Sequence, residues 1–124
     1  MDPLYQEHIL EHYKHPHNRG LMEGFDVKKK GENISCGDDL TLYLKWNLAA
    51  QAGGDTLLDI SFEGFGCAIS QSGASMLTDK VKGMMRADIA KLTEKDMYEL
   101  YGTVISPQRE KCALLALSTL HSAL

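Results

Sequence analysis

Residues 40–45 (LTLYLK) and 58–62 (LDISF) decide the fold class of this 124-residue chain. In both stretches apolar and polar side chains alternate, which is the period of a β-strand with one buried face. Between them, residues 51–55 (QAGGD) have the composition of a turn. We therefore predict an antiparallel hairpin, and a shorter third strand around residues 27–30 is consistent with it.

Helical patterns lie on both sides of this predicted hairpin. Residues 3–15 repeat apolar side chains every four positions and stop at Pro16. After the hairpin, Ser106 and Pro107 have the N-cap and first-position chemistry of a last helix. The other predicted helices are residues 67–82, 86–91 and 94–101, the last of these with a variant capping box between Thr93 and Asp96.

Strands that come first and helices that follow them predict an α+β fold. We expect an N-terminal helix and a small antiparallel sheet of about three strands, covered by the C-terminal helices. The composition, with 44% apolar and 24% charged residues, is typical of a single globular domain spanning residues 1–124.

Charge and hydropathy exclude two classes of partner. The formal net charge of −4 gives no electrostatic support for nucleic-acid binding. No apolar stretch reaches the roughly 20 residues that cross a bilayer, so no membrane span is predicted. The first residues lack the basic start and apolar centre of a signal peptide, and we therefore expect a cytoplasmic protein.

Three cysteines without a CxxC pair carry most of the chemistry in this chain. An odd number disfavours a disulfide framework and leaves the thiols available. Cys36 lies in a turn before a predicted strand, Cys67 at a helix start and Cys112 in the first turns of the last helix. A thiol at a helix N-terminus feels the positive end of the helix dipole, which favours the thiolate.

Asp38, two residues after Cys36, adds a carboxylate to this set. Three sulfurs and one carboxylate could form a tetrahedral site for zinc, or for iron in a cluster. The carboxylate is the harder ligand and the easiest to displace, so such a site could free a thiolate for reaction. The alternative is that the cysteines are buried small apolar side chains, because their wide spacing matches no short zinc motif.

Residues 8–12 (HILEH) match the H-x-x-E-H motif of zinc peptidases. The spacing places His8 and His12 on one helix face, with Glu11 beside them. Because a site so near a chain end lacks walls that exclude water, we interpret the match as a coincidence. Adventitious metal binding by the N-terminal histidines stays open (His8, His12, His15 and His17).

Several blocks of sequence carry a family resemblance. They are residues 2–7 (DPLYQE), 12–16 (HYKHP) with 18–20 (NRG), 36–39 (CGDD), 64–70 (GFGCAIS) and 109–113 (REKCA). In this order they resemble the scaffold family of iron–sulfur cluster assembly, which comprises the SufU and IscU proteins and the N-terminal domain of NifU. The resemblance implies a fold in which three cysteines and one aspartate converge at one end, here Cys36, Asp38, Cys67 and Cys112.

Within the family the chain looks closer to the SufU type. It has Lys111 where IscU-type members carry a histidine, and it lacks their Leu-Pro-Pro-Val-Lys stretch. One departure is the absence of the insertion that SufU proteins usually carry between the second and third cysteines.

The resemblance to SufU-type proteins implies a zinc-dependent sulfur acceptor rather than a conventional enzyme. The resemblance therefore implies Zn²⁺ as the cofactor and a SufS-like cysteine desulfurase as the partner. It points to Cys112 as the thiolate that takes the persulfide sulfur, and Arg109, one helical turn earlier, could stabilise the displaced Asp38 or thiolate. The alternative for Arg109 is an ordinary surface arginine.

Two other functions use the same four ligands. The first is a scaffold that assembles a [2Fe–2S] cluster and transfers it to apo-proteins or cluster carriers. The second, outside the family, is a structural zinc-binding domain.

Overall fold

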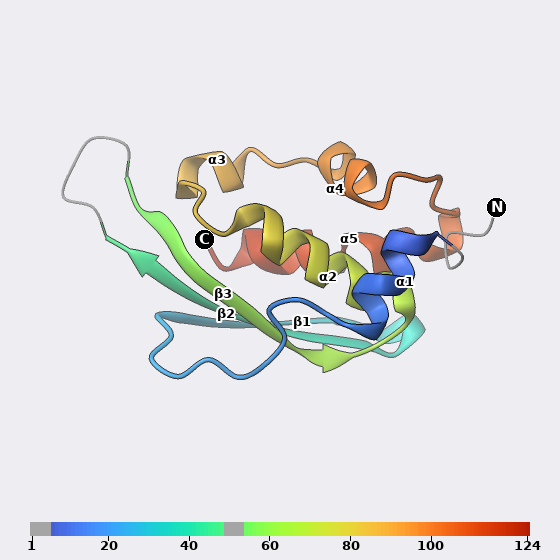
Figure 1. Ribbon diagram of the computed structural model, residues 1–124, viewed down its shortest axis with the longest axis horizontal. Coiled ribbons are helices and arrows are strands. Elements are labelled where there is room, and N and C mark those ends of the chain that lie inside the picture. Colours follow the sequence, from blue (N-terminus) through green and yellow to red (C-terminus); the bar gives the residue numbers. More distant parts are fainter. Residues whose placement is uncertain (1–5, 49–53) are drawn as a thin grey trace.

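The structure, a computed structural model, describes residues 6–48 and 54–124 and has the predicted α+β fold (Figure 1). The elements are α1 (Glu7–Lys14), β1 (Val27–Asn33), the 3-10 turn η2 (Ile34–Cys36), β2 (Asp38–Asn47), β3 (Thr56–Phe65), α2 (Ala68–Val81), α3 (Arg86–Ala90), α4 (Glu94–Tyr101), the 3-10 turn η3 (Pro107–Arg109) and α5 (Glu110–Ser122).

The strands form one antiparallel sheet in the order β1-β2-β3. The predicted hairpin is β2 and β3, in which Leu42 pairs with Phe62. The third strand is longer than predicted, because β1 continues to Asn33, which pairs with Asp38. Of the predicted turn, residues 51–53 lie outside the described part of the chain.

The prediction that Leu58 shares a buried face with Ile60 and Phe62 is wrong. Lys45 pairs with Asp59 and Trp46 with Leu57, so Leu58 is an extra residue on β3. Such a bulge shifts the alternation by one position. Leu57 is therefore fully buried, whereas Leu58 is 54% exposed.

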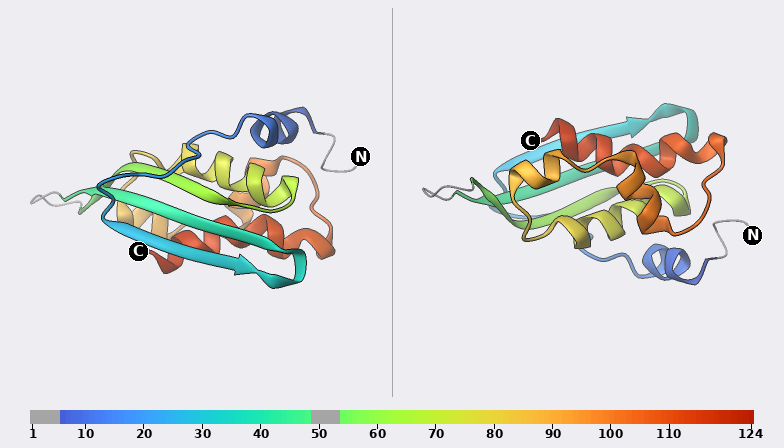
Figure 2. Two further views of the ribbon diagram at one scale, coloured as in Figure 1. Left: turned by 90° about the horizontal axis from the view of Figure 1, so that it is seen from below. Right: turned by 90° about the horizontal axis from the view of Figure 1, so that it is seen from above.

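Helices α2 and α5 lie side by side on one face of the sheet, and α3 and α4 lie above them (Figures 1 and 2). Helix α1 packs beside α2. The sheet contributes Leu40, Leu42, Leu44, Ile60 and Phe62 to the core beneath these helices. At Gly31 of β1, a Cβ atom would overlap the Thr119 side chain of α5, so the missing side chain lets this helix approach the sheet closely.

Most helix boundaries lie close to the predicted ones, and the last helix is the exception. Helix α4 spans the predicted residues, its capping box is present, and Gly102 ends it with a positive φ of 66°. The last helix differs from the prediction, because Ser106 and Pro107 open a 3-10 turn that leads into α5 at Glu110. Helix α1 ends at Lys14; the first residues of the predicted 3–15 helix lie outside the described chain. None of the helices in residues 6–48 and 54–124 is long and apolar enough to cross a membrane.

Candidate metal centre

Three segments that are distant in sequence meet at one end of the molecule. They are the η2 turn with the start of β2, the start of α2 and the start of α5 (Figure 1). Gly37, at a left-handed φ of 70°, reverses the chain between Cys36 and Asp38. Cys67 is the N-cap residue of α2, and Cys112 is the third residue of α5.

Three of the predicted ligand residues present their donor atoms to one another. The donor atoms of Cys36, Asp38 and Cys112 all lie within 4.8 Å of each other. Cys36 is exposed, whereas Asp38 is 3% and Cys112 2% exposed. The Cys67 sulfur is not among these three donor atoms, although the backbone N–H of Cys67 donates to Asp38 Oδ1 at 3.0 Å.

The Asp38 carboxylate is held by donors from three parts of the chain. Oδ1 also accepts a hydrogen bond from Ser70 Oγ at 3.1 Å, and Oδ2 accepts one from Asn33 Nδ2 at 3.3 Å. Asn33 Nδ2 also lies 3.5 Å from Cys112 Sγ, which is a second acceptor for this amide group. A buried carboxylate with several donors keeps its position whether or not it also binds a metal.

Gly66, directly before Cys67, has no room for a side chain. A Cβ atom there would overlap Asp38 Oδ1 and Ser70 Oγ. The glycine therefore lets the start of α2 approach the carboxylate closely.

Burial controls the Cys112 thiol in the metal-free protein. Desolvation raises the pKa of Cys112 well above its usual range, and hydrogen bonding to Asp38 and Cys36 raises it further. For this residue burial opposes the thiolate that the helix N-terminus favours. The raised pKa favours the neutral thiol in the metal-free protein.

Arg109 and Lys111 lie on either side of the start of α5. Arg109 is half-buried and ends the η3 turn, with its backbone N–H bonded to the Ser106 carbonyl. Lys111 is exposed and adjoins Cys112 in sequence.

The donor set fits a thiophilic metal. Sulfur and carboxylate atoms from separate elements are close enough to share one centre, and the exposed Cys36 leaves one side open to solvent. In contrast, His8 does not join His12 in any group of metal-capable side chains among the described residues. The geometry thus gives no support to the zinc-peptidase interpretation of residues 8–12.

Three further residues belong to this site and were not predicted from the sequence: Asn33, Ser70 and Tyr101. Asn33 and Ser70 bind the carboxylate, and the fully buried Tyr101 hydroxyl lies 3.0 Å from both the Ile69 and the Ala113 carbonyls, beneath the starts of α2 and α5. Only Ser70 carried a local signal, because it lies one turn after a cysteine at a helix start. The other two come from elements that meet only in the tertiary structure.

The fold and donor set define a class of small α+β proteins that can hold a metal or cluster on cysteine ligands at one end. A family model described as the NifU-like N terminal domain matches residues 4–124. The chain therefore belongs to this family of iron–sulfur cluster assembly scaffold proteins, as the resemblance indicated.

Relatives of both named branches are similar to the chain. The scaffold protein IscU of Aquifex aeolicus is 35% identical over 120 residues, covering 97% of this chain and 73% of its own length. The zinc-dependent sulfurtransferase SufU of Bacillus subtilis is 40% identical over 83 residues, 67% of this chain and 52% of its own length.

A solved structure has the same fold. The crystal structure of a protein described as a SUF-system iron–sulfur cluster assembly scaffold, from Fervidobacterium islandicum, matches with a TM-score of 0.78 at 29% identity. The match covers 97% of this chain and 96% of the other.

Proposed function

We propose that this protein accepts persulfide sulfur from a cysteine desulfurase at a zinc site formed by Cys36, Asp38, Cys67 and Cys112. The observation that carries the proposal is the approach of three of these donor atoms to within 4.8 Å of one another. The SufU relative, whose name describes a zinc-dependent sulfurtransferase, supports the same interpretation. The partner is a SufS-like enzyme whose active cysteine carries the persulfide.

Zinc bound to these residues supplies the positive charge that keeps a buried thiol ionised. The high pKa of the metal-free Cys112 thiol explains why this chain needs such a charge. If zinc is held here, Asp38 would be the ligand that exchanges most easily, because Asn33, Ser70 and the Cys67 N–H already donate hydrogen bonds to its oxygens. After leaving the metal, the Asp38 carboxylate would keep these three hydrogen bonds and would need no new ones.

In the transfer step Cys112 is the nucleophile. Its thiolate attacks the outer sulfur of the partner's persulfide, and a new S–S bond forms. The S–S bond within the partner breaks, and its electron pair remains on the partner's cysteine, which leaves as a thiolate. Cys112 then carries the persulfide, and Arg109 supplies a positive charge near the starting point of α5.

Assembly of a [2Fe–2S] cluster on the same four residues is the second candidate. The observation that favours it is the IscU relative, which is named a scaffold and covers 97% of this chain. In this case the iron and sulfide are cargo, and apo-proteins or cluster carriers receive them.

The test measures zinc content and desulfurase turnover on the same samples. We expect about one zinc per chain at the cysteine site and faster alanine release by the desulfurase. Cys112→Ser should lose at least roughly tenfold of this stimulation, because an alcohol is a far weaker nucleophile than a thiolate. Asp38→Asn tests the proposed aspartate ligand. Asp39→Asn is its control, since Asp39 is adjacent but not in the donor group.

Three outcomes separate the candidates. Stimulation that is lost in Cys112→Ser and Asp38→Asn but kept in Asp39→Asn supports sulfur acceptance. A protein that leaves turnover unchanged and accumulates a transferable cluster under anaerobic conditions is a scaffold. A protein that binds zinc tightly and does neither is a structural zinc domain, and the proposal is then wrong.

A further inference from the structure

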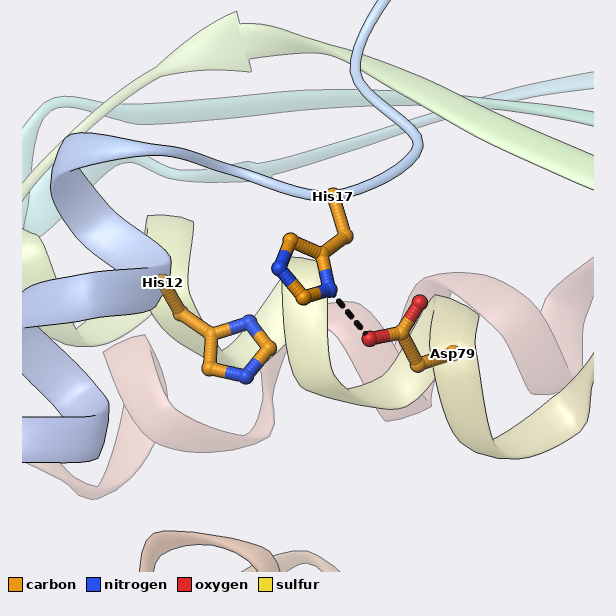
Figure 3. A group of neighbouring side chains, drawn as sticks. All are labelled: His12, His17 and Asp79. Carbon is orange, nitrogen blue, oxygen red and sulfur yellow. Dashed lines mark hydrogen bonds and ion pairs between the residues drawn. The ribbon is translucent and has the colours of Figure 1, made fainter.

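A second group of metal-capable side chains lies between α1, the loop that follows it and α2. It consists of His12, His17 and Asp79, hereafter the histidine site. One ring nitrogen from each histidine and one Asp79 oxygen all lie within 4.8 Å of one another. Figure 3 shows both imidazole rings on the side of α2 that carries Asp79, with His17 between His12 and the carboxylate.

Neighbouring groups hold the His12 and Asp79 side chains and the His17 backbone in place. His12 Nδ1 lies 2.7 Å from Ser75 Oγ, and the backbone N–H of His17 donates to the same oxygen, also at 2.7 Å. Asn18 Nδ2 donates to Asp79 Oδ1 at 2.8 Å. A site whose ligands are fixed by surrounding hydrogen bonds loses little conformational entropy when it takes up an ion.

A hydrogen bond between His17 and Asp79 explains only part of this arrangement. His17 Nδ1 lies 2.5 Å from Asp79 Oδ2, which satisfies those two residues. The His12 ring is nevertheless packed against the His17 ring, with centroids 4.4 Å apart. Two protonated imidazoles at this distance repel each other, whereas two neutral imidazoles can share a cation through their lone pairs.

The charge and chemistry of the donors indicate the class of ion. Two neutral imidazoles and one carboxylate carry a charge of −1, which favours a cation. Two nitrogens and one oxygen suit zinc-like divalent transition metals, whereas magnesium and calcium prefer oxygen ligands. The side chains of His17 and Asp79 are 47% and 44% exposed, so an ion and its remaining water ligands can reach the site from solvent.

We propose that His12, His17 and Asp79 bind a divalent transition-metal ion of the zinc class. The site is separate from the cysteine site, because Asp79 lies 12 residues along α2 from Cys67, about 18 Å at the helical rise. A bound ion links α1 and its following loop to α2. The proposal does not depend on the proposed function of the cysteine site.

The test is a Zn²⁺ titration of the full chain, with bound metal counted by metal analysis and histidine ring signals followed by NMR. The signals of His12 and His17 should shift or broaden, while those of His15 and His121 stay unchanged. His17→Gln should bind one zinc fewer per chain than the wild type, or bind that ion at least roughly tenfold more weakly. His15→Gln, at an exposed histidine two residues away, is the matched control and should bind as the wild type does.

Other outcomes decide against the proposal or confirm it independently of the cysteines. Because His17 is half exposed, His17→Gln should fold, and Asp79→Asn provides a second variant of nearly unchanged shape. Unmoved His12 and His17 signals, or equal zinc binding by wild type and both variants, would overturn the proposal. If the cysteine site binds no zinc, the histidine site still accounts for one ion, which both variants lose.

Discussion

At the scale of single residues, Asp38 is the most informative side chain. It is a carboxylate at 3% exposure, and burying a charge is costly unless donors surround it. Asn33, Ser70 and the Cys67 N–H supply those donors. The same three hydrogen bonds join β1, the start of β2 and the start of α2, so one side chain both orders the site and connects the elements.

We predict that Asp38→Ala destabilises the metal-free protein by about 1–3 kcal/mol, because buried donors lose their acceptor. Urea denaturation in the presence of a chelator measures the change in the free energy of unfolding. Asp39→Ala is the control. The Asp39 side chain is half-buried and forms a long ion pair, at 3.8 Å, with the exposed Lys30 ammonium, and such pairs contribute little to stability. Equal stability of the two variants would contradict this view of Asp38.

At the scale of elements, the ends of the helices follow local chemistry. At the start of α4, the Asp96 carboxylate accepts hydrogen bonds from the Thr93 backbone N–H at 2.7 Å and from the Thr93 hydroxyl at 3.1 Å. The backbone bond in particular lowers the pKa of Asp96 below 3.8. The folded state therefore favours the ionised carboxylate.

This gives the capping box a predictable pH dependence. The folded-state pKa of Asp96 is lowered. Its stabilising contribution to the free energy of unfolding is therefore present above about pH 3.8 and is lost as the pH falls through the folded-state pKa. The difference in unfolding free energy between wild type and Asp96→Ala should thus be largest near neutral pH and shrink in acid. Chemical denaturation at a series of pH values measures it. Glu99→Ala, at an exposed carboxylate in the same helix but outside the capping box, is the control.

At the scale of the whole molecule, Tyr101 connects three helices under the cysteine site. It extends from α4, and its fully buried hydroxyl lies 3.0 Å from carbonyls of α2 and α5. Gly73 makes room for it, since a Cβ atom at that position would overlap the hydroxyl. The helices that carry Cys67 and Cys112 are therefore positioned relative to each other by a residue on a third helix.

We expect Tyr101→Phe to lower the free energy of unfolding by about 1 kcal/mol, because it removes a buried hydrogen bond without changing the ring. Thermal and urea denaturation measure the loss. Tyr98→Phe, a half-buried tyrosine on the same helix, is the matched control and should change stability less. If Tyr101→Phe is as stable as the wild type, the hydroxyl does not contribute to the packing of these helices.

Much of the fold could be predicted from the sequence because its signals are local. Alternation identified β2 and β3, and capping and glycine chemistry located the ends of α4. The bulge at Leu58 could not be predicted, because it depends on which residue of β2 each residue of β3 pairs with.

The candidate site divides in the same way. The residue types and the family resemblance predicted the cysteines and Asp38 as candidate ligands, but not which donor atoms approach one another or how burial raises the pKa of Cys112. The sequence also did not predict the roles of Asn33 and Tyr101, or the contact between His17 and Asp79.

The amino-acid sequence alone determined most of the elements and the kind of chemistry available, since these depend on neighbours within one or two turns of chain. Only the tertiary structure decided which side chains lie close together and which thiol has its pKa raised by burial. The physical reason is that hydrogen bonding and desolvation act over a few ångströms in space, between residues such as His17 and Asp79 that lie 62 positions apart in the chain.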